Sequence, residues 1–136
     1  TVPGMPLVYS GQEVGLNHSL EFFEKDEIKW VGNSPLTAFY TQLDKLKHEN
    51  QALYAGIDAG KMNILNHTAP ESVFAFTRTK GNNQLLVMLN LSRKTVQFKL
   101  DQPLTDSYAD AFTGQAVKPV SPLTLKAGEY RVWVKK

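Results

Sequence analysis

The sequence predicts a mainly β protein, in which an antiparallel β-sandwich of Greek-key type follows a short strand, a loop and one helix. Two changes of pattern lead to this prediction. Apolar residues recur with helical spacing over residues 36–46, which indicates an amphipathic helix. From about residue 60 the period falls to two, and short apolar runs alternate with turns that contain Gly and Pro. Strands and turns spaced in this way are typical of sandwiches rather than of βαβ units.

The composition is that of a globular domain and argues against several classes of partner. The chain has 136 residues, of which 42% are hydrophobic and 21% are charged. The 15 Lys and Arg and 13 Asp and Glu are scattered, and without a basic stripe we expect no nucleic-acid partner. No apolar run reaches the roughly 20 residues that span a bilayer, so we expect no membrane segment. The absence of cysteine excludes disulfides and thiolate chemistry.

The chain begins with a predicted strand over residues 5–9 that leads into a polar tip. Pairing must start after Pro6, because proline cannot donate a hydrogen bond to a neighbouring strand. The tip is Ser10-Gly11-Gln12-Glu13. A buried parallel strand that carries polar side chains into a loop is what the mouth of an α/β barrel requires. Residues 10–33 are too polar and too irregular for a longer element, so we expect a loop there.

A helix is predicted over residues 35–49, after the sequence Asn33-Ser34-Pro35. The Ser34 side chain can accept a hydrogen bond from a first-turn amide, and Pro35 suits the first helical position because its missing N–H would be unpaired there. The apolar face of the helix is formed by Leu36, Phe39, Tyr40, Leu43 and Leu46. We expect Asn50 to end the helix in a left-handed conformation.

The remaining chain predicts a hairpin followed by several short strands. The hairpin joins residues 73–79 to residues 84–91 through Lys80-Gly81-Asn82-Asn83. Further strands are predicted over residues 95–100, 108–112, 123–125 and 130–134. Alternation along the strands makes most aromatic residues core candidates, with Phe74 and Phe76 on the same face. One exposed aromatic residue, Tyr108 or Trp133, stays open as a weak surface binding site.

This order of elements, together with three local motifs, resembles the C-terminal end of an alpha-amylase family glycoside hydrolase. The sharpest motif is Gly4-x-Pro6-x-x-Tyr9-x-Gly11-x-Glu13, which in that family forms the eighth barrel strand and its tip. Lys25-Asp26-Glu27-Ile28-Lys29-Trp30 and Val87-Met88-Leu89-Asn90-Leu91-Ser92 add to the resemblance. The resemblance implies that residues 1–55 are the C-terminal remnant of a (β/α)8 barrel and that residues 56–136 form a C-terminal antiparallel β-sandwich.

The resemblance also implies an activity for the parent protein, a retaining α-glycosidase or transglycosidase that acts on α-glucans or maltooligosaccharides. In that family the catalytic carboxylates come from earlier barrel strands, so we assign no catalytic residue and expect this chain alone to be inactive. Glu24, Asp26 and Glu27 have Lys25 and Lys29 among them, which indicates a solvated loop of balanced charge. No cofactor or metal site is predicted, because the three histidines lack the spacing that brings two imidazoles to one ion.

Six residues are the predicted sugar contacts, because the loop after the eighth strand borders the substrate cleft in that family. They are Gln12, Glu13, Asn17, His18, Phe22 and Phe23. Phe22 and Phe23 offer flat apolar faces for sugar rings. Two interpretations of Glu13 are open: it contacts sugar, or it holds the loop by accepting backbone N–H bonds. Ile28 and Trp30 are expected to pack within the fold.

Two other functions fit the same sequence. The chain could be a stand-alone carbohydrate-binding module, or a purely structural β domain with an N-terminal extension. A further expectation concerns Met5, Leu7 and Val8, whose apolar side chains are suited to burial on both faces of a strand. Exposed barrel-facing residues of this kind predict self-association.

Overall fold

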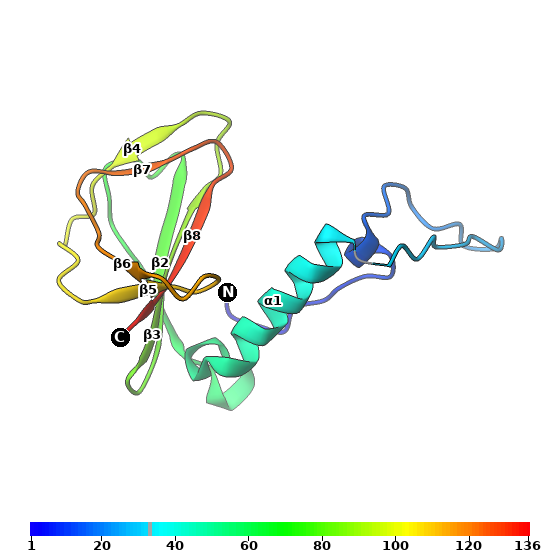
Figure 1. Ribbon diagram of the computed structural model, residues 1–136, viewed down its shortest axis with the longest axis horizontal. Helices are drawn as coiled ribbons and strands as arrows, with labels where there is room; N and C mark the ends of the chain where they lie inside the picture. Colours follow the sequence, from blue (N-terminus) through cyan, green and yellow to red (C-terminus); the bar gives the residue numbers. More distant parts are fainter. Residues whose placement is uncertain (33) are drawn as a thin grey trace.

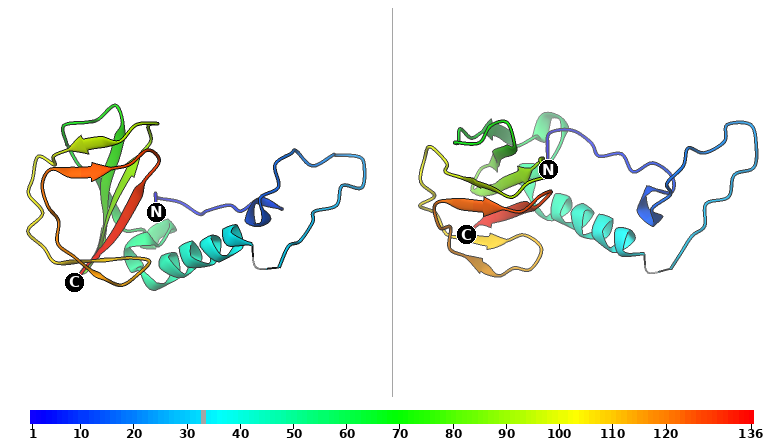
Figure 2. Two further views of the ribbon diagram at one scale, coloured as in Figure 1. Left: turned by 45° about the horizontal axis from the view of Figure 1, so that its top comes forward. Right: turned by 90° about the horizontal axis from the view of Figure 1, so that it is seen from above.

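The computed structural model describes residues 1–32 and 34–136, so Asn33 of the predicted helix start lies outside the described residues. Figure 1 shows a β-sandwich and, projecting from it, helix α1 (Pro35–Glu49) with a long loop beyond the helix. We call residues 1–32 the arm. The arm leaves the sandwich at the N-terminus, runs beside α1, forms the short 3-10 helix η1 (Gln12–Val14) and continues into the loop (Figures 1 and 2).

Helix α1 has the predicted bounds, but it ends differently from the prediction. Ser34 Oγ accepts a hydrogen bond from Leu36 N at 3.3 Å, and Pro35 occupies the first turn. The expectation of a left-handed Asn50 is wrong, because its backbone is extended, with φ −120° and ψ 105°. Its side chain satisfies the helix end instead, since Nδ2 donates to the Leu46 carbonyl oxygen at 2.7 Å. The chain then passes through η2 (Gln51–Leu53) and η3 (Gly56–Asp58).

The predicted antiparallel sandwich is confirmed. Its larger sheet has six strands in the order β1-β2-β3-β8-β5-β6, and a separate layer pairs β4 with β7. The strands are β1 (Lys61–Ile64), β2 (Val73–Lys80), β3 (Asn83–Asn90), β4 (Val96–Phe98), β5 (Tyr108–Asp110), β6 (Ala116–Val117), β7 (Leu123–Leu125) and β8 (Tyr130–Lys135). The hairpin is where the sequence predicted it, with Lys80 paired to Asn83. Strands β1 and β6 were not predicted.

The central strands of the larger sheet are buried on both faces. Toward β4 and β7, the core contains Ala75, Leu86 and Met88 together with the aromatic residues Phe98, Tyr108 and Trp133. Toward α1 and η2, a second core includes Leu46, Leu53, Phe76, Val87 and Val132. The burial of Tyr108 and Trp133 rules both out as an exposed sugar platform; the partly exposed aromatic residue of β8 is Tyr130.

The prediction of a strand over residues 5–9 is wrong for this chain. Among the described residues, this segment has no strand partner and is extended without a ladder. A strand exists only through hydrogen bonds to a neighbour, and a barrel strand needs one on each side. Met5 and Leu7 are each 82% exposed as a result.

Asn90 is a buried polar residue that connects the two layers. Its Nδ2 donates to the carbonyl oxygens of Lys94, Leu125 and Lys126 at 2.7, 3.2 and 2.8 Å. Its Oδ1 accepts from Ser92 N at 3.0 Å. Asn90 therefore ties the end of β3 to β7 and to the turn that follows it.

Candidate functional site

The tip of the arm, residues 10–15, is a tight turn that requires glycine at both ends. Gly11 and Gly15 flank η1 with φ values of 92° and 79°, in the left-handed region that favours glycine. A Cβ at Gly11 would also lie 2.8 Å from the Leu16 Cβ. Gln12 closes the turn, because its Oε1 accepts a hydrogen bond from Tyr9 N at 2.9 Å. Gln12 therefore has a structural contact in addition to the predicted contact with sugar.

Glu13 joins the tip to helix α1 through its main chain. Thr37 Oγ1 donates to the Glu13 carbonyl oxygen at 2.7 Å. The side chain is half-buried, and its Oε2 is a buried atom with no hydrogen-bond partner among the described residues. A buried carboxylate oxygen is costly unless it accepts a hydrogen bond. The Glu13 side chain thus carries an unsatisfied acceptor that is buried at the tip.

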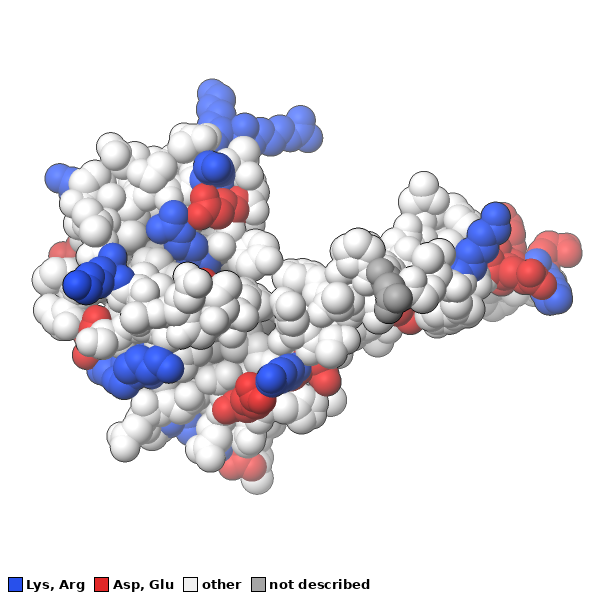
Figure 3. All heavy atoms as spheres, in the orientation of Figure 1, with Lys and Arg blue, Asp and Glu red and all other residues white. Residues whose placement is uncertain are grey.

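His18 and Asp26 fold the loop after the tip back on itself. His18 Nε2 lies 3.1 Å from Asp26 Oδ2, which also accepts from Glu21 N at 3.2 Å. Lys25 and Glu27 form an exposed ion pair at 2.7 Å. Figure 3 shows acidic and basic side chains gathered together at the far end of this loop. The expected balance of charge is only partial, because the four carboxylates of residues 16–32 outnumber Lys25 and Lys29. Asp26 is the least exposed of these carboxylates.

The aromatic residues of the loop are exposed. Phe22 and Phe23 are 89% and 90% exposed, and their rings meet edge to face with centroids 4.8 Å apart. The expectation that Trp30 packs is wrong for this chain, because Trp30 is 64% exposed, whereas Ile28 is half-buried. The physical reason is that the loop projects away from both the sheet and α1 (Figure 2).

The structure brings some of the six predicted contact residues together. Gln12 and His18 line one hollow with residues that the sequence reasoning did not select: Tyr9, Ser10, Leu16, Ser19 and Leu20. Tyr9 stands in the sharpest sequence motif, which was the available signal. Asn17 is exposed beside the hollow in sequence, and Phe22 and Phe23 lie further along the loop. The hollow and the aromatic pair are two separate parts of the predicted site.

The described residues contain neither a metal-binding cluster nor a membrane-spanning helix. No group of three or more His, Cys, Asp or Glu side chains in residues 1–32 and 34–136 is placed to hold a metal ion. Over the same residues, α1 is too short and too polar to cross a membrane, and no other helix is long enough.

The fold is shared with solved amylases. A maltogenic alpha-amylase, AmyB from Thermotoga neapolitana, matches 98% of this chain with a TM-score of 0.77 at 23% identity. The structure of AmyP in complex with maltose matches 73% of this chain with a TM-score of 0.56 at 19% identity. This chain covers 33% of the AmyB chain and 20% of the AmyP chain. At these identities the likeness is one of fold.

Sequence comparison shows the family. The profile of the family described as maltogenic amylase, C-terminal domain, matches residues 62–132, and the chain belongs to this family. Alpha-amylase MalA of Haloarcula japonica is 29% identical over an alignment of 120 residues that covers 85% of this chain. The chain spans 17% of the length of that relative.

Proposed function

We propose that the chain acts as the C-terminal part of a retaining α-glycosidase or transglycosidase of the alpha-amylase family. In this proposal, residues 1–55 complete a (β/α)8 barrel, and residues 56–136 cover α1 and stabilise the barrel. The substrate of the whole protein is an α-glucan or maltooligosaccharide. Membership of the maltogenic amylase C-terminal domain family supports this, as does the likeness to an alpha-amylase and to an amylase structure that contains maltose.

The observation that carries the proposal is the apolar segment before the tip. Met5 and Leu7 are each 82% exposed, and Val8 is 45% exposed. A parallel barrel strand is buried on both faces and reads as a continuous apolar run. The segment has this composition, and it leads into a polar tip, where barrels place functional side chains.

We propose that this chain alone does not hydrolyse glucans. Retaining hydrolysis needs two carboxyl groups held about 5–5.5 Å apart, one as nucleophile and one as acid/base. Of the four loop acids, Glu21, Glu24, Asp26 and Glu27, Asp26 is hydrogen-bonded to His18 and Glu27 is paired with Lys25. The test is reducing-sugar release from starch and maltooligosaccharides by the purified chain. No release above a buffer control is expected, and steady release that copurifies with the chain would overturn the assignment.

We propose that Gln12, Glu13, Asn17, His18, Phe22 and Phe23 contact the outer part of a bound oligosaccharide. Phe22 and Phe23 would cover the C–H face of a sugar ring, and the polar side chains at the tip would bind its hydroxyl groups. Calorimetric titration with maltoheptaose tests this. Replacing both phenylalanines by alanine should weaken binding about tenfold. Leu91→Ala, at an exposed apolar residue of the sandwich, is the matched control and should bind as the parent does.

A stand-alone carbohydrate-binding module is the second candidate, and exposed Tyr130 is the observation that favours it. Tyr130 is 45% exposed and meets the rings of Phe39 and Phe112 at 6.0 and 5.8 Å. If Tyr130→Ala abolishes maltoheptaose binding while the phenylalanine variant retains it, the module is favoured. If the parent chain shows no heat of binding at all, a purely structural β domain is favoured.

We also propose that the isolated chain self-associates through Met5, Leu7 and Val8. Exposed apolar surface of this kind favours association with a second copy. Light scattering of the purified chain should give a mass above 15.2 kDa that falls when Met5 and Leu7 are replaced by serine. A monomeric parent at all concentrations would contradict this.

A further inference from the structure

Arg78 is a fully buried cation that has no acidic partner among the described residues. It lies on β2, on the sheet face that packs against α1 and η2, and its exposed fraction is 0%. Nη1 donates to the Thr1 carbonyl oxygen at 2.9 Å, and Nη2 donates to the Tyr54 carbonyl oxygen at 3.3 Å. Its buried Nε has no acceptor in residues 1–32 and 34–136. Burial lowers the pKa of this guanidinium.

A buried charge of this kind is costly for folding and therefore calls for an explanation. Removing a guanidinium from water is repaid only by excellent geometry and by satisfying its remaining hydrogens. Here both partners are neutral main-chain carbonyls, and one N–H is unsatisfied. The arrangement does fix geometry, because the planar guanidinium group holds the two carbonyl groups in a defined position relative to each other. One carbonyl belongs to the arm and the other to the turn after η2.

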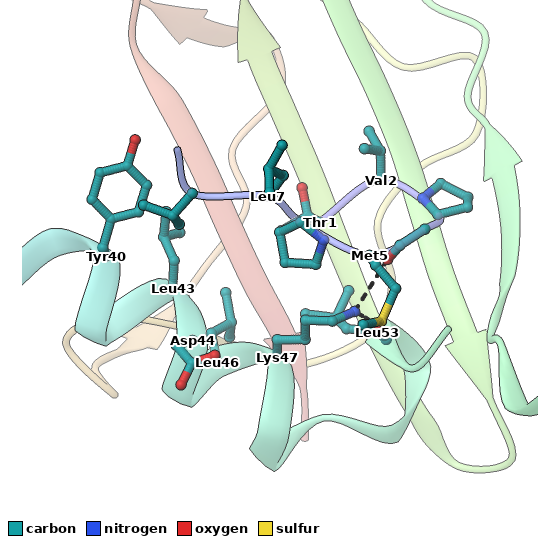
Figure 4. A pocket seen from close by; sticks show the side chains of 14 residues that line it. Thr1, Val2, Met5, Leu7, Tyr40, Leu43, Asp44, Leu46, Lys47 and Leu53 are labelled. Atoms are coloured by element: carbon teal, nitrogen blue, oxygen red, sulfur yellow. Dashed lines mark hydrogen bonds between the residues drawn. The ribbon is translucent and has the colours of Figure 1, made fainter. Parts of the chain in front are cut away.

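Lys47, on helix α1, is a second cationic side chain that contacts main-chain carbonyl oxygens. Its Nζ donates to the Leu53 carbonyl oxygen at 2.7 Å and lies 3.4 Å from the Gly4 carbonyl oxygen. Figure 4 shows the arm passing over α1, with Lys47 reaching toward the arm from the helix. Met5 and Leu7 line the groove between the arm and the helix together with Leu43 and Leu46.

These contacts hold the arm at three places along its length. Arg78 binds the backbone at Thr1, Lys47 reaches Gly4, and Thr37 binds Glu13 at the tip. In the described residues the segment between Thr1 and Tyr9 has no strand ladder that would fix its position otherwise. Because carbonyl groups are bound, the contacts do not depend on the side chains of the arm.

We infer that Arg78 and Lys47 are positioning residues, which hold the main chain of the arm at residues 1–4 and thereby set where the Gln12-Glu13 tip stands relative to the sandwich. The consequence for sugar contact rests on the proposed function of the tip. The placement of the tip is independent of that function. A residue that only stabilises the fold would change the melting temperature, whereas a positioning residue changes where the tip lies.

Distances between spin labels test this directly, because the chain contains no cysteine that would compete for labelling. Ser10→Cys places one label at the tip, and Lys118→Cys places the other on an exposed position of the sandwich. The doubly labelled parent, diluted with unlabelled chain so that only distances within one molecule are measured, should give one narrow distance distribution. Arg78→Met and Lys47→Met should each broaden it several-fold, while Arg78→Lys, which keeps a donor, should restore part of the narrow component.

Two matched controls remove a charge without touching the arm. Lys80→Met lies two residues from Arg78 on β2 and loses a contact to Asp58. Lys45→Met lies two residues from Lys47 on α1 and loses an exposed pair with Glu49. Both should leave the distribution narrow. An unchanged distribution in both Arg78→Met and Lys47→Met, or equal broadening in the controls, would overturn the inference. Circular dichroism shows whether each variant is folded. If Arg78→Met does not fold, the distance distribution of Lys47→Met alone tests the inference.

Sugar binding is measured separately, so that the two proposals fail in different ways. If the parent binds maltoheptaose, Arg78→Met should weaken binding several-fold and Lys80→Met should not. If the parent binds no sugar, the proposed contact site fails. The distance distributions then still decide whether Arg78 and Lys47 position the arm.

Discussion

The sandwich and the arm both contain large apolar side chains, but they differ in how far those side chains are buried. In the sandwich, Phe76, Val87 and Phe98 are at most 1% exposed, and the sheet has a core on each face. In the arm, most of the large apolar residues are exposed; the exposed ones are Val2, Met5, Leu7, Val8, Tyr9, Phe22, Phe23, Trp30 and Val31. The sandwich therefore buries most of its own apolar side chains, whereas the arm exposes most of its large apolar side chains. The following predictions test this contrast, from the largest expected effect to the smallest.

The largest effect is expected for Phe76→Ala in the core between the sheet and α1. Emptying this fully buried position should lower the free energy of unfolding by about 4 kcal/mol, because a cavity is left in a packed core. Leu7→Ala, in the arm, should change it by less than about 0.5 kcal/mol. Urea unfolding followed by circular dichroism measures both. Similar losses for the two variants would break the contrast.

Asn90→Ala should have the next largest effect, about 2 kcal/mol, because three carbonyl groups lose their donor. The loss of stability should be confined to the sandwich. Hydrogen exchange at the amides of β3 and β7 would show faster opening, with the amides of α1 unchanged. Uniformly faster exchange would mean that the helix and the sandwich unfold as one unit.

Ser34→Ala removes the cap of α1 and should cost about 1 kcal/mol. Because the cap lies at the end of α1 that is remote from the sandwich, the first turn should fray locally. Amide exchange at Thr37 and Ala38 should increase without a change at β2. Ser34→Asp, which retains a capping oxygen, should behave like the parent.

The smallest effect concerns acid pH and Glu129 in the turn before β8. Burial of Glu129 would raise its pKa, but hydrogen bonds from Lys126 N and Arg131 Nε outweigh this and hold the pKa below its ordinary value of 4.5. A lowered folded-state pKa contributes stability that is present above the unfolded-state pKa and is lost as the pH falls through the folded-state pKa.

Melting curves from pH 7 to pH 3 measure this contribution. Glu129→Gln should melt below the parent at pH 7, and the difference should shrink below about pH 4.5 as the parent carboxylate is protonated. Glu71→Gln is the control, at an exposed acid outside this turn. A difference between parent and Glu129→Gln that does not depend on pH would contradict the assignment of the lowered pKa.

The sequence predicted those elements whose signals are local. Helix α1 was predicted with its bounds because Ser34 and Pro35 mark its start. The hairpin was predicted because Gly81 and Asn82 lie between two alternating apolar runs. Strand β1 was missed, since an edge strand of mostly exposed residues shows no alternation of burial. Strand β6 has two residues, which is too short for any period.

Features that depend on distant contacts could not be predicted from local patterns. Residues 5–9 have the composition of a strand, but pairing needs neighbours that the described residues do not supply. Trp30 is a residue type that is usually buried, but it is exposed because the described residues supply no neighbour that covers it. The Gln12 and Glu13 tip was selected from its motif, whereas Leu16 and Ser19 beside it become apparent only when the loop is folded.

The burial of Asn90 has a consequence for glycan attachment. The chain contains three Asn-x-Ser/Thr sequences, which begin at Asn17, Asn66 and Asn90. Asn17 and Asn66 are exposed, whereas Asn90 is 2% exposed and uses its amide nitrogen for three hydrogen bonds. In a host that glycosylates such sequences, the folded protein can carry sugar chains at the first two sites, and a glycan on Asn90 is compatible only with chains whose two layers have not come together.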